Sequence, residues 1–352
     1  ATSLWATAFI WIWNFISGMM LCWFYGKGKA LKKGFPAVLA ISIIHGGGQM
    51  LVSQFNATLA CFVPTVVAIG VIVVLGRTPW YKDPWRVEES PVMDRSAGSA
   101  EEEDAPEDMS VLQAFLPYIV LTILTLVILL VKPIKEFLGQ VKLGFAFPGM
   151  VTGYGYEDPA ADPFSPLAIF THAGMFLLVS AIFGFFYFKS KGWLHEDSGA
   201  MIGRRTVKKT IPSSISVICF IAMSKVMGGT GQTTVMAQGI AGVMGEAYVA
   251  LSPIVGLLGS FMTSSNMASN ILFGSFQLAT ANFLGLNPAP VLGAQTAGGA
   301  IGAAICPGNI VLGCTTAGIM GQEGKVLQKV LPITLAAAAI VGVIMYVTCI
   351  LL

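Results

Sequence analysis

Apolar residues along the chain gather into long runs separated by short polar or basic stretches. A run of about 20 apolar residues forms a helix that crosses the roughly 30 Å hydrocarbon core of a bilayer. The pattern predicts an all-α, polytopic membrane protein that crosses the bilayer about seven times. The expected spans are residues 4–25, 35–55, 56–75, 111–131, 166–188, 211–227 and 330–352.

Composition agrees with a membrane class, because 55% of the 352 residues are hydrophobic and only 11% are charged. The net charge of +2 gives no reason to expect a nucleic-acid partner. The six cysteines lie in or beside apolar segments without paired metal-ligand spacing, so we expect neither a disulfide framework nor a metal site. We also expect no cofactor and no enzyme activity, since the sequence holds no HExxH, GxSxG, Walker or dinucleotide motif.

Basic residues mark which loops we expect on the cytoplasmic side. Lys27, Lys29, Lys32 and Lys33 follow the first span, and a second basic stretch lies within residues 189–209. Cytoplasmic loops carry an excess of Lys and Arg, and alternation of the spans places both stretches on the same side.

A polar stretch at residues 77–110 divides the spans into two groups. Its second half is strongly acidic, with the run EEEDAPED at Glu101–Asp108, and it has little apolar periodicity. Such a segment cannot bury enough apolar surface to offset the entropy of ordering. We expect a flexible cytoplasmic linker between three helices at residues 1–76 and a second repeat at residues 111–352.

Residues 259–318 place polar and glycine-rich sequence inside otherwise apolar sequence. In hydrocarbon, irregular backbone survives only where it is buried in protein or lines a watery cavity. We expect two broken or re-entrant segments, at residues 249–284 and 288–320. The first breaks at TSSN, and the second is expected to break at Gln295–Gly299 and again at Cys306–Asn309. Two broken segments in one chain indicate an inverted-repeat transporter whose half-helix ends face the substrate.

The first break offers groups that could bind an anion. A half-helix that begins near Ser264 or Ser265 would carry unpaired amides and a partial positive charge to the break. Asn266 and Asn270 are four residues apart, so they share one helix face, with Ser269 beside it. In the second break, glycines allow close approach of a ligand and the proline frees a carbonyl. The candidate substrate-binding residues are Thr263, Ser264, Ser265, Asn266, Ser269, Asn270, Gln295, Thr296, Gly298, Gly299, Pro307 and Asn309.

The same small residues have a second interpretation. Glycine, serine and alanine at four-residue spacing allow membrane helices to pack closely, so any single glycine here could serve packing and not ligand contact. Two ionisable residues near the spans are also open to two interpretations. Lys225 is either an anion partner or a lysine that reaches the interface, and His45 is either a proton relay or a hydrogen-bonded structural histidine.

Four stretches of the chain resemble the bacterial L-lactate permease family, which imports lactate and related 2-hydroxy monocarboxylates with protons. They read SPIVGLLGSFMTSSNMASNILFGSFQLATANFLGLNP, TAGGAIGAAICPGNIVLGCTTAGIMGQEGKVL, ISIIHGGGQMLVSQF and FSPLAIFTHAGMFLLVSAIF. The resemblance covers the carboxyl-terminal two thirds of such a protein. It implies a secondary transporter of a small organic anion, with H+ or Na+ as the coupling ion, in the bacterial inner (plasma) membrane.

Two departures from the family pattern concern the mechanism. Asn266 stands where many members have an aspartate, and Ala303 stands where many have a lysine. Both changes remove a charge, so proton coupling and lactate itself are uncertain for this chain. The alternative function is a membrane channel or an incomplete half-transporter, which a homo-oligomer or a missing amino-terminal repeat would complete.

Overall fold

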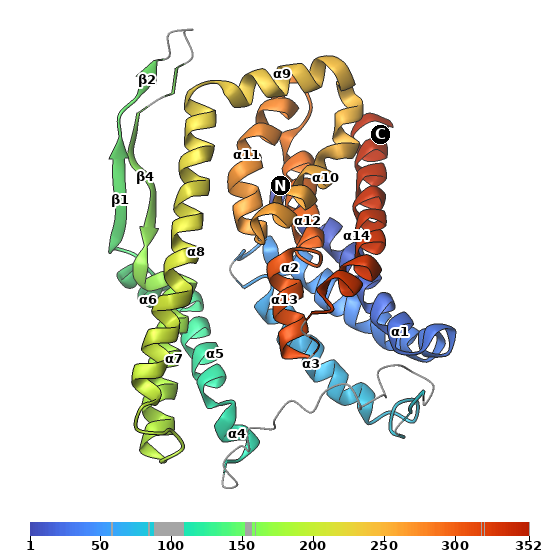
Figure 1. Ribbon diagram of the computed structural model, residues 1–352, viewed down its shortest axis with the longest axis vertical. Coiled ribbons are helices and arrows are strands. Elements are labelled where there is room, and N and C mark those ends of the chain that lie inside the picture. Colours follow the sequence, from blue (N-terminus) through green and yellow to red (C-terminus); the bar gives the residue numbers. More distant parts are fainter. Residues whose placement is uncertain are drawn as a thin grey trace. The chain divides into compact units, whose positions relative to one another are not determined.

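The computed structural model describes residues 1–57, 59–83, 85–87, 109–151, 157–158, 160–317, 319 and 321–351. The chain divides into two compact units, which we describe separately. The first combines Ala1–Ala100 with Val217–Leu352, and the second is Glu101–Ser216. Figure 1 shows their elements in chain order.

The first unit begins with a helical hairpin. Helix α1 (Thr2–Ser42) consists of two helices that meet at a kink, where Gly26 and Lys27 leave helical geometry. The second arm continues through a π-helical turn (Ile43–Gly47) into α2 (Gly48–Ser53). The first two predicted spans are therefore present as helices, and the basic stretch between them includes the kink.

Contacts between the arms show that they run antiparallel. The Trp11 indole Nε1 donates to Ser42 Oγ at 3.1 Å, near one end of the pair. Nearer the kink, the rings of Phe15 and Phe35 lie 6.3 Å apart. Helix α3 (Phe62–Gly76) follows and provides the third predicted span, although it has only 15 residues.

The described start of the predicted linker contacts this hairpin. The Tyr81 hydroxyl donates to the Lys33 carbonyl at 2.8 Å, and Lys33 Nζ donates to the Trp80 carbonyl. The Trp85 ring lies 6.1 Å from that of Tyr25. The acidic run at residues 101–108 lies outside the described residues, so its flexibility stays a prediction.

The rest of the first unit is a helical bundle. Its elements are α9 (Gln232–Met244), a 3-10 turn (Gly245–Leu251), α10 (Ser252–Thr263), α11 (Asn266–Phe283), α12 (Pro288–Gly302), α13 (Pro307–Thr316), α14 (Glu323–Tyr346) and a π turn (Val347–Leu351). Helix α10 packs against α11, α12 and α14, as Figure 1 shows, and α1 packs against α12. The core of this bundle consists of small and branched side chains such as Val291, Ala294 and Val341.

Glycines bring α10 and α12 into backbone contact. A Cβ on Gly298 would lie 1.9 Å from the carbonyl oxygen of Pro253, and one on Gly302 would lie 2.5 Å from that of Leu257. These two glycines are four residues apart and therefore face the same neighbour. Small residues at this spacing are how membrane helices approach closely.

One predicted break is wrong. Helix α12 runs without interruption through Gln295–Gly299, where we expected the chain to leave helical geometry. The glycines are tolerated inside the helix because the backbone of α10 fills the space beside them. This segment is interrupted once, between the end of α12 at Gly302 and the start of α13 at Pro307. The interruption expected at Cys306–Asn309 is therefore present, but it begins after Gly302 and ends at Cys306.

The second unit has helices and two short β-ribbons. The helices are α4 (Val111–Ala114), α5 (Leu116–Leu130), α6 (Lys132–Leu138), a 3-10 turn (Ile169–Thr171), α7 (Ala173–Ser190) and α8 (Ser198–Gly229), which ends in the first unit. The strands are β1 (Lys142–Phe147), β2 (Met150–Val151), β3 (Glu157–Asp158) and β4 (Ala161–Ala168). Strands β1 and β4 pair antiparallel with Leu143 opposite Leu167, and β2 pairs with β3.

Three expectations for this unit need correction. The β-ribbons were not expected, because the Gly- and Pro-rich sequence shows no clear period-two pattern. The fifth span begins at Ala173 and not at residue 166, since β4 continues to Ala168. Much of the second basic stretch is helical, because α8 begins at Ser198.

Within the described residues, five helical stretches are long and apolar enough to cross a membrane. A sixth is present if α5 and α6, which meet at a 91° bend, are counted as one broken span. The stretch Thr2–Ser53 is counted once although it contains both hairpin arms, and α3 is shorter. The chain is therefore a predominantly α-helical, multi-pass membrane protein.

Candidate functional site

The candidate site is built around the break between α10 and α11. Ser264 adopts a left-handed conformation (φ 53°, ψ 25°), and Ser265 is extended before α11 begins at Asn266. The Thr263 hydroxyl lies 2.8 Å from the Gly259 carbonyl oxygen and 2.9 Å from that of Ser265. Ser265 Oγ accepts the Ala268 amide at 3.2 Å and caps the helix. The polar sequence TSSN thus ends one helix and starts the next.

The amino terminus of α13 meets this break. The Gly308 amide donates to Ser264 Oγ at 3.3 Å, although 44 residues separate the two along the chain. Pro307 has no amide hydrogen, and the Asn309 side chain donates to the Ala303 carbonyl at 2.9 Å. Two helix amino termini therefore lie at one place, and each carries a partial positive charge. The structure brings the two predicted breaks together.

Helix α12 provides a glycine that accommodates Asn266. A Cβ on Gly299 would lie only 2.1 Å from Asn266 Oδ1, so no other residue type fits without a shift. The amide oxygen of Asn266 is thus held against the α12 backbone, at the first turn of α11. Gly299, a predicted site residue, lies beside the break for this reason.

Three oxygen atoms near the break are buried without a hydrogen-bond partner among the described residues: Asn266 Oδ1, Asn270 Oδ1 and Ser260 Oγ. Asn270 lies one turn along α11 from Asn266, and Ser260 lies one turn before Ser264 on α10. Buried polar atoms in native proteins nearly always have a partner, so each exception calls for an explanation. A ligand with donor groups, a cation or ordered water would satisfy these oxygens.

Two other predicted residues take part in a satisfied network instead. Gln295 Oε1 accepts from Gln277 Nε2 at 2.9 Å, and Gln295 Nε2 donates to Ser269 Oγ at 3.2 Å. Ser269 Oγ in turn donates to the Gly256 carbonyl at 2.9 Å, and the Tyr248 hydroxyl donates to Gln277 Oε1 at 2.6 Å. Gln295 and Ser269 therefore connect α10, α11 and α12, and their polar groups face protein partners.

Three further predicted residues have other surroundings. Gly298 packs on Pro253, as described above, and the Thr296 hydroxyl donates to the Leu292 carbonyl of its own helix at 2.9 Å. Lys225 lies on α8 with an exposed side chain. Gly298 and Thr296 therefore fit a structural role.

His45 lies in the hairpin and not at the break. Its Nδ1 is 2.5 Å from Asn14 Nδ2, and its Nε2 is 3.2 Å from Thr65 Oγ1. The histidine therefore joins both arms of the hairpin to α3. It sits in the π-helical turn, a local irregularity that is frequent at functional sites.

Sequence reasoning missed four residues that the structure places in or next to the site. Ser260 and Gly308 belong to the break, while Tyr248 and Gln277 complete the network. Ser260 could have been found, because it is four residues before Ser264 and shares its helix face. Gln277 has no comparable signal, since its partners lie 18, 25 and 29 residues away.

Comparisons with known proteins agree on one family. The chain is 24% identical to the L-lactate permease of Halalkalibacterium halodurans, over 95% of this chain and 60% of the relative. It is 25% identical to the glycolate permease GlcA of Escherichia coli, over 90% of this chain and 59% of the relative. It is also 29% identical to the L-lactate permease of Escherichia coli, over 50% of this chain and 31% of that protein.

The chain spans about three fifths of the length of the first two relatives. No solved structure matches it. The sequence profile of the L-lactate permease family matches residues 2–352, which is almost the whole chain. The chain therefore belongs to the L-lactate permease family.

Proposed function

We propose that this chain forms the substrate-binding part of a secondary transporter, and not an enzyme, for lactate, glycolate or a related small monocarboxylate. The family membership and the names of the relatives support transport of such an anion. The observation that carries the proposal is the meeting of two helix amino termini beside buried, unpaired oxygens at the α10–α11 break.

The groups at the break match the two ends of a 2-hydroxy acid. The first amides of α11, at Asn266 and Met267, have no acceptor inside their own helix and can donate to a carboxylate. The hydroxyl of the substrate can donate to Asn270 Oδ1 or Asn266 Oδ1, which need a donor. The carboxylate is thus bound without a buried lysine or arginine.

Coupling to H+ or Na+ belongs to the same proposal. The unpaired oxygens could also coordinate a sodium ion, because amide and hydroxyl oxygens are suitable ligands for a hard cation. His45 is the candidate proton carrier, because its imidazole ring is an ionisable group in the π-helical turn of the hairpin. Asn14 Nδ2 donates to His45 Nδ1, so Nδ1 is the unprotonated nitrogen of the ring. A proton on Nδ1 would require the Asn14 side chain to rotate and present its oxygen to the ring. Lys225 remains the candidate cation that would pair with the transported anion.

Uptake into vesicles tests the proposal. Purified protein is reconstituted, and entry of labelled lactate, glycolate and pyruvate is measured with an imposed proton gradient, with a sodium gradient and with neither. We expect one gradient to drive uptake above the equilibrium level. Equal leakage of all three anions, independent of either gradient, would instead indicate a channel or an inactive half-transporter.

A variant pair then tests the site. Asn270→Leu removes an unpaired buried oxygen, and Asn282→Leu changes an exposed asparagine near the other end of the same helix. We expect Asn270→Leu to weaken uptake at least tenfold while Asn282→Leu stays close to the unaltered protein. Equal uptake by both variants would remove Asn270 from the site.

A further inference from the structure

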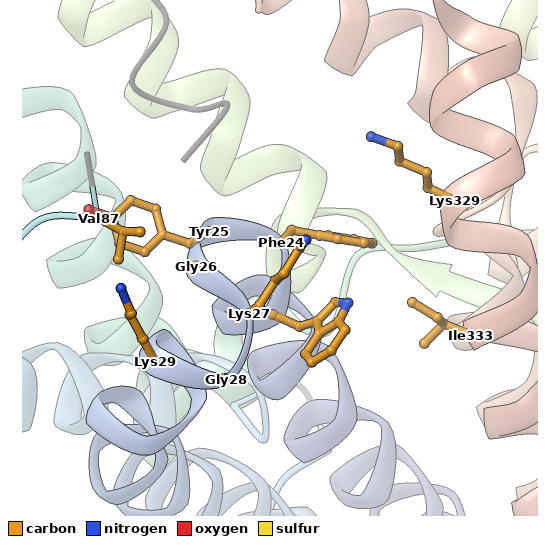
Figure 2. A pocket seen from close by; sticks show the side chains of 10 residues that line it. Phe24, Tyr25, Gly26, Lys27, Gly28, Lys29, Val87, Lys329 and Ile333 are labelled. Atoms are coloured by element: carbon orange, nitrogen blue, oxygen red, sulfur yellow. The ribbon is translucent and has the colours of Figure 1, made fainter. Parts of the chain in front are cut away.

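A second candidate site lies where the hairpin turn of α1 faces α14. It is a cavity of about 600 Å³ lined by residues 23–29, with Val87, Lys329 and Ile333. Figure 2 shows Lys329 and Ile333 on α14 at one side and the turn that carries Lys27 at the other. All of these residues belong to the first unit, and none was predicted as a site residue.

The described lining of this cavity is basic. Lys27 and Lys329 contribute two ammonium groups, and no carboxylate is among the described lining residues. In Figure 2 the side chains of Lys27 and Lys329 both extend into the space between the turn and α14. Two cations that face one cavity favour an anionic ligand.

The backbone at Lys27 is strained, which argues that its side chain is needed. Lys27 has φ 47° and ψ −134°, a conformation that glycine adopts readily and other residues rarely do. Glycines stand on both sides of it, at Gly26 and Gly28, yet the position with positive φ carries a lysine. Strained residues of this kind are concentrated at ligand-binding sites.

Aromatic side chains line the same cavity. Trp23, Phe24 and Tyr25 end the first apolar span directly before the turn. Trp23 is 49% exposed and Phe24 is 36% exposed, so the wall of the cavity itself presents an open apolar surface. Tryptophan and tyrosine at the end of a membrane helix lie at the level of the lipid headgroups.

We propose that this cavity binds the headgroup of an anionic phospholipid, with the phosphate between the lysines and the acyl chains along Trp23 and Phe24. A basic pocket between membrane helices at the headgroup level matches such a lipid. A soluble anion would use the lysines but would gain nothing from the exposed apolar surface beside them. The proposal does not depend on which substrate is transported.

The test measures binding of phosphatidylglycerol to the purified chain in neutral detergent by native mass spectrometry. Phosphatidylcholine is the neutral lipid, and glycerol phosphate and inorganic phosphate are the soluble anions. Each lysine near an anionic headgroup strengthens binding about five- to sixfold, so loss of two lysines should lower the affinity about 30-fold. We therefore expect Lys27→Gln with Lys329→Gln to weaken phosphatidylglycerol binding about 30-fold, with no effect on phosphatidylcholine.

Two controls keep the test specific. Lys32→Gln with Lys325→Gln removes the same charge from α1 and α14, but at exposed lysines outside this cavity, and should change affinity less than threefold. Lys27→Gly relieves the strained backbone, so it should keep or raise the melting temperature without lipid and still weaken lipid binding. Equal losses in the two double variants, or equally tight binding of glycerol phosphate, would overturn the proposal.

Discussion

Helices α10, α11 and α12 hold two groups of buried polar side chains that differ in one respect. In the network of Gln277, Gln295 and Ser269, amide and hydroxyl groups find protein partners across the helices. At the nearby break, the oxygens of Asn266 and Asn270 find none among the described residues. The difference shows that polarity inside a membrane bundle is not by itself a sign of function: a satisfied group fixes helix packing, and an unsatisfied one is available to a ligand.

The two groups face different neighbours. Gln277 on α11 and Gln295 on α12 hydrogen-bond to each other between the two helices. Each amide group therefore has a second partner close by: the Ser252 carbonyl for Gln277 and the Ser269 hydroxyl for Gln295. Asn266 is shorter and starts at the first residue of α11, where its oxygen is held against Gly299. Substitutions in the packing network should therefore reduce stability, and substitutions at the break should reduce binding.

The largest loss of stability is expected at the glycine contact between α10 and α12. Gly298→Ala would place a Cβ 1.9 Å from the Pro253 carbonyl oxygen, and the helices must separate to admit it. We expect a loss of about 3 kcal/mol in the free energy of unfolding. Gly274→Ala is the matched control, because nothing lies within 4 Å of its Cβ and alanine favours a helix. Thermal unfolding in detergent compares the two, and similar melting temperatures would contradict the packing account.

A smaller loss is expected for Gln295→Leu. This change leaves one Gln277 amide hydrogen and the Ser269 carbonyl without their partner, at a cost of about 1–2 kcal/mol. The same measurement on Gln232→Leu, an exposed glutamine on α9, provides the control. If Gln295→Leu were fully stable but failed to bind substrate, Gln295 would return to the binding site as first predicted.

The smallest effect is expected at Ser264, within the break. Ser264→Ala loses the hydrogen bond from Gly308 and keeps the left-handed backbone, so it should cost about 1 kcal/mol. Ser264→Gly loses the same bond but removes strain of roughly 1 kcal/mol, so its stability should stay near that of the unaltered chain. Equal melting temperatures for the two variants would show that the left-handed conformation is not present.

Much of the bundle could be predicted because its physical signals are local. Apolar runs predicted the hairpin arms, α3, α5, α7 and α14, and TSSN predicted the position of the first break. The second break was predicted at Cys306–Asn309, and the structure has it at residues 303–306, directly before α13 begins at Pro307. Its carboxyl-terminal end could be predicted because proline is favoured in the first turn of a helix and disfavoured in its interior.

The errors came from signals that depend on neighbours. Gly298 and Gly299 were interpreted as an interruption, but they remain helical because α10 and Asn266 occupy the space beside them. The choice between Asn270 as an unpaired group and Gln295 as a paired one could not be made from sequence, because the partners of Gln295 lie 18 and 26 residues away. Likewise, nothing local brings Lys329 to the turn that carries Lys27.

Substrate protection of a cysteine at the break tests the central proposal most directly. Ser264→Cys and, as a control, Asn282→Cys are treated with a maleimide in the presence of lactate or glycolate, and labelling of each position is quantified by mass spectrometry. The proposed site predicts that the substrate slows labelling at position 264 several-fold and leaves position 282 unchanged. Labelling at position 264 that does not respond to either anion would contradict the assignment of the substrate to this break.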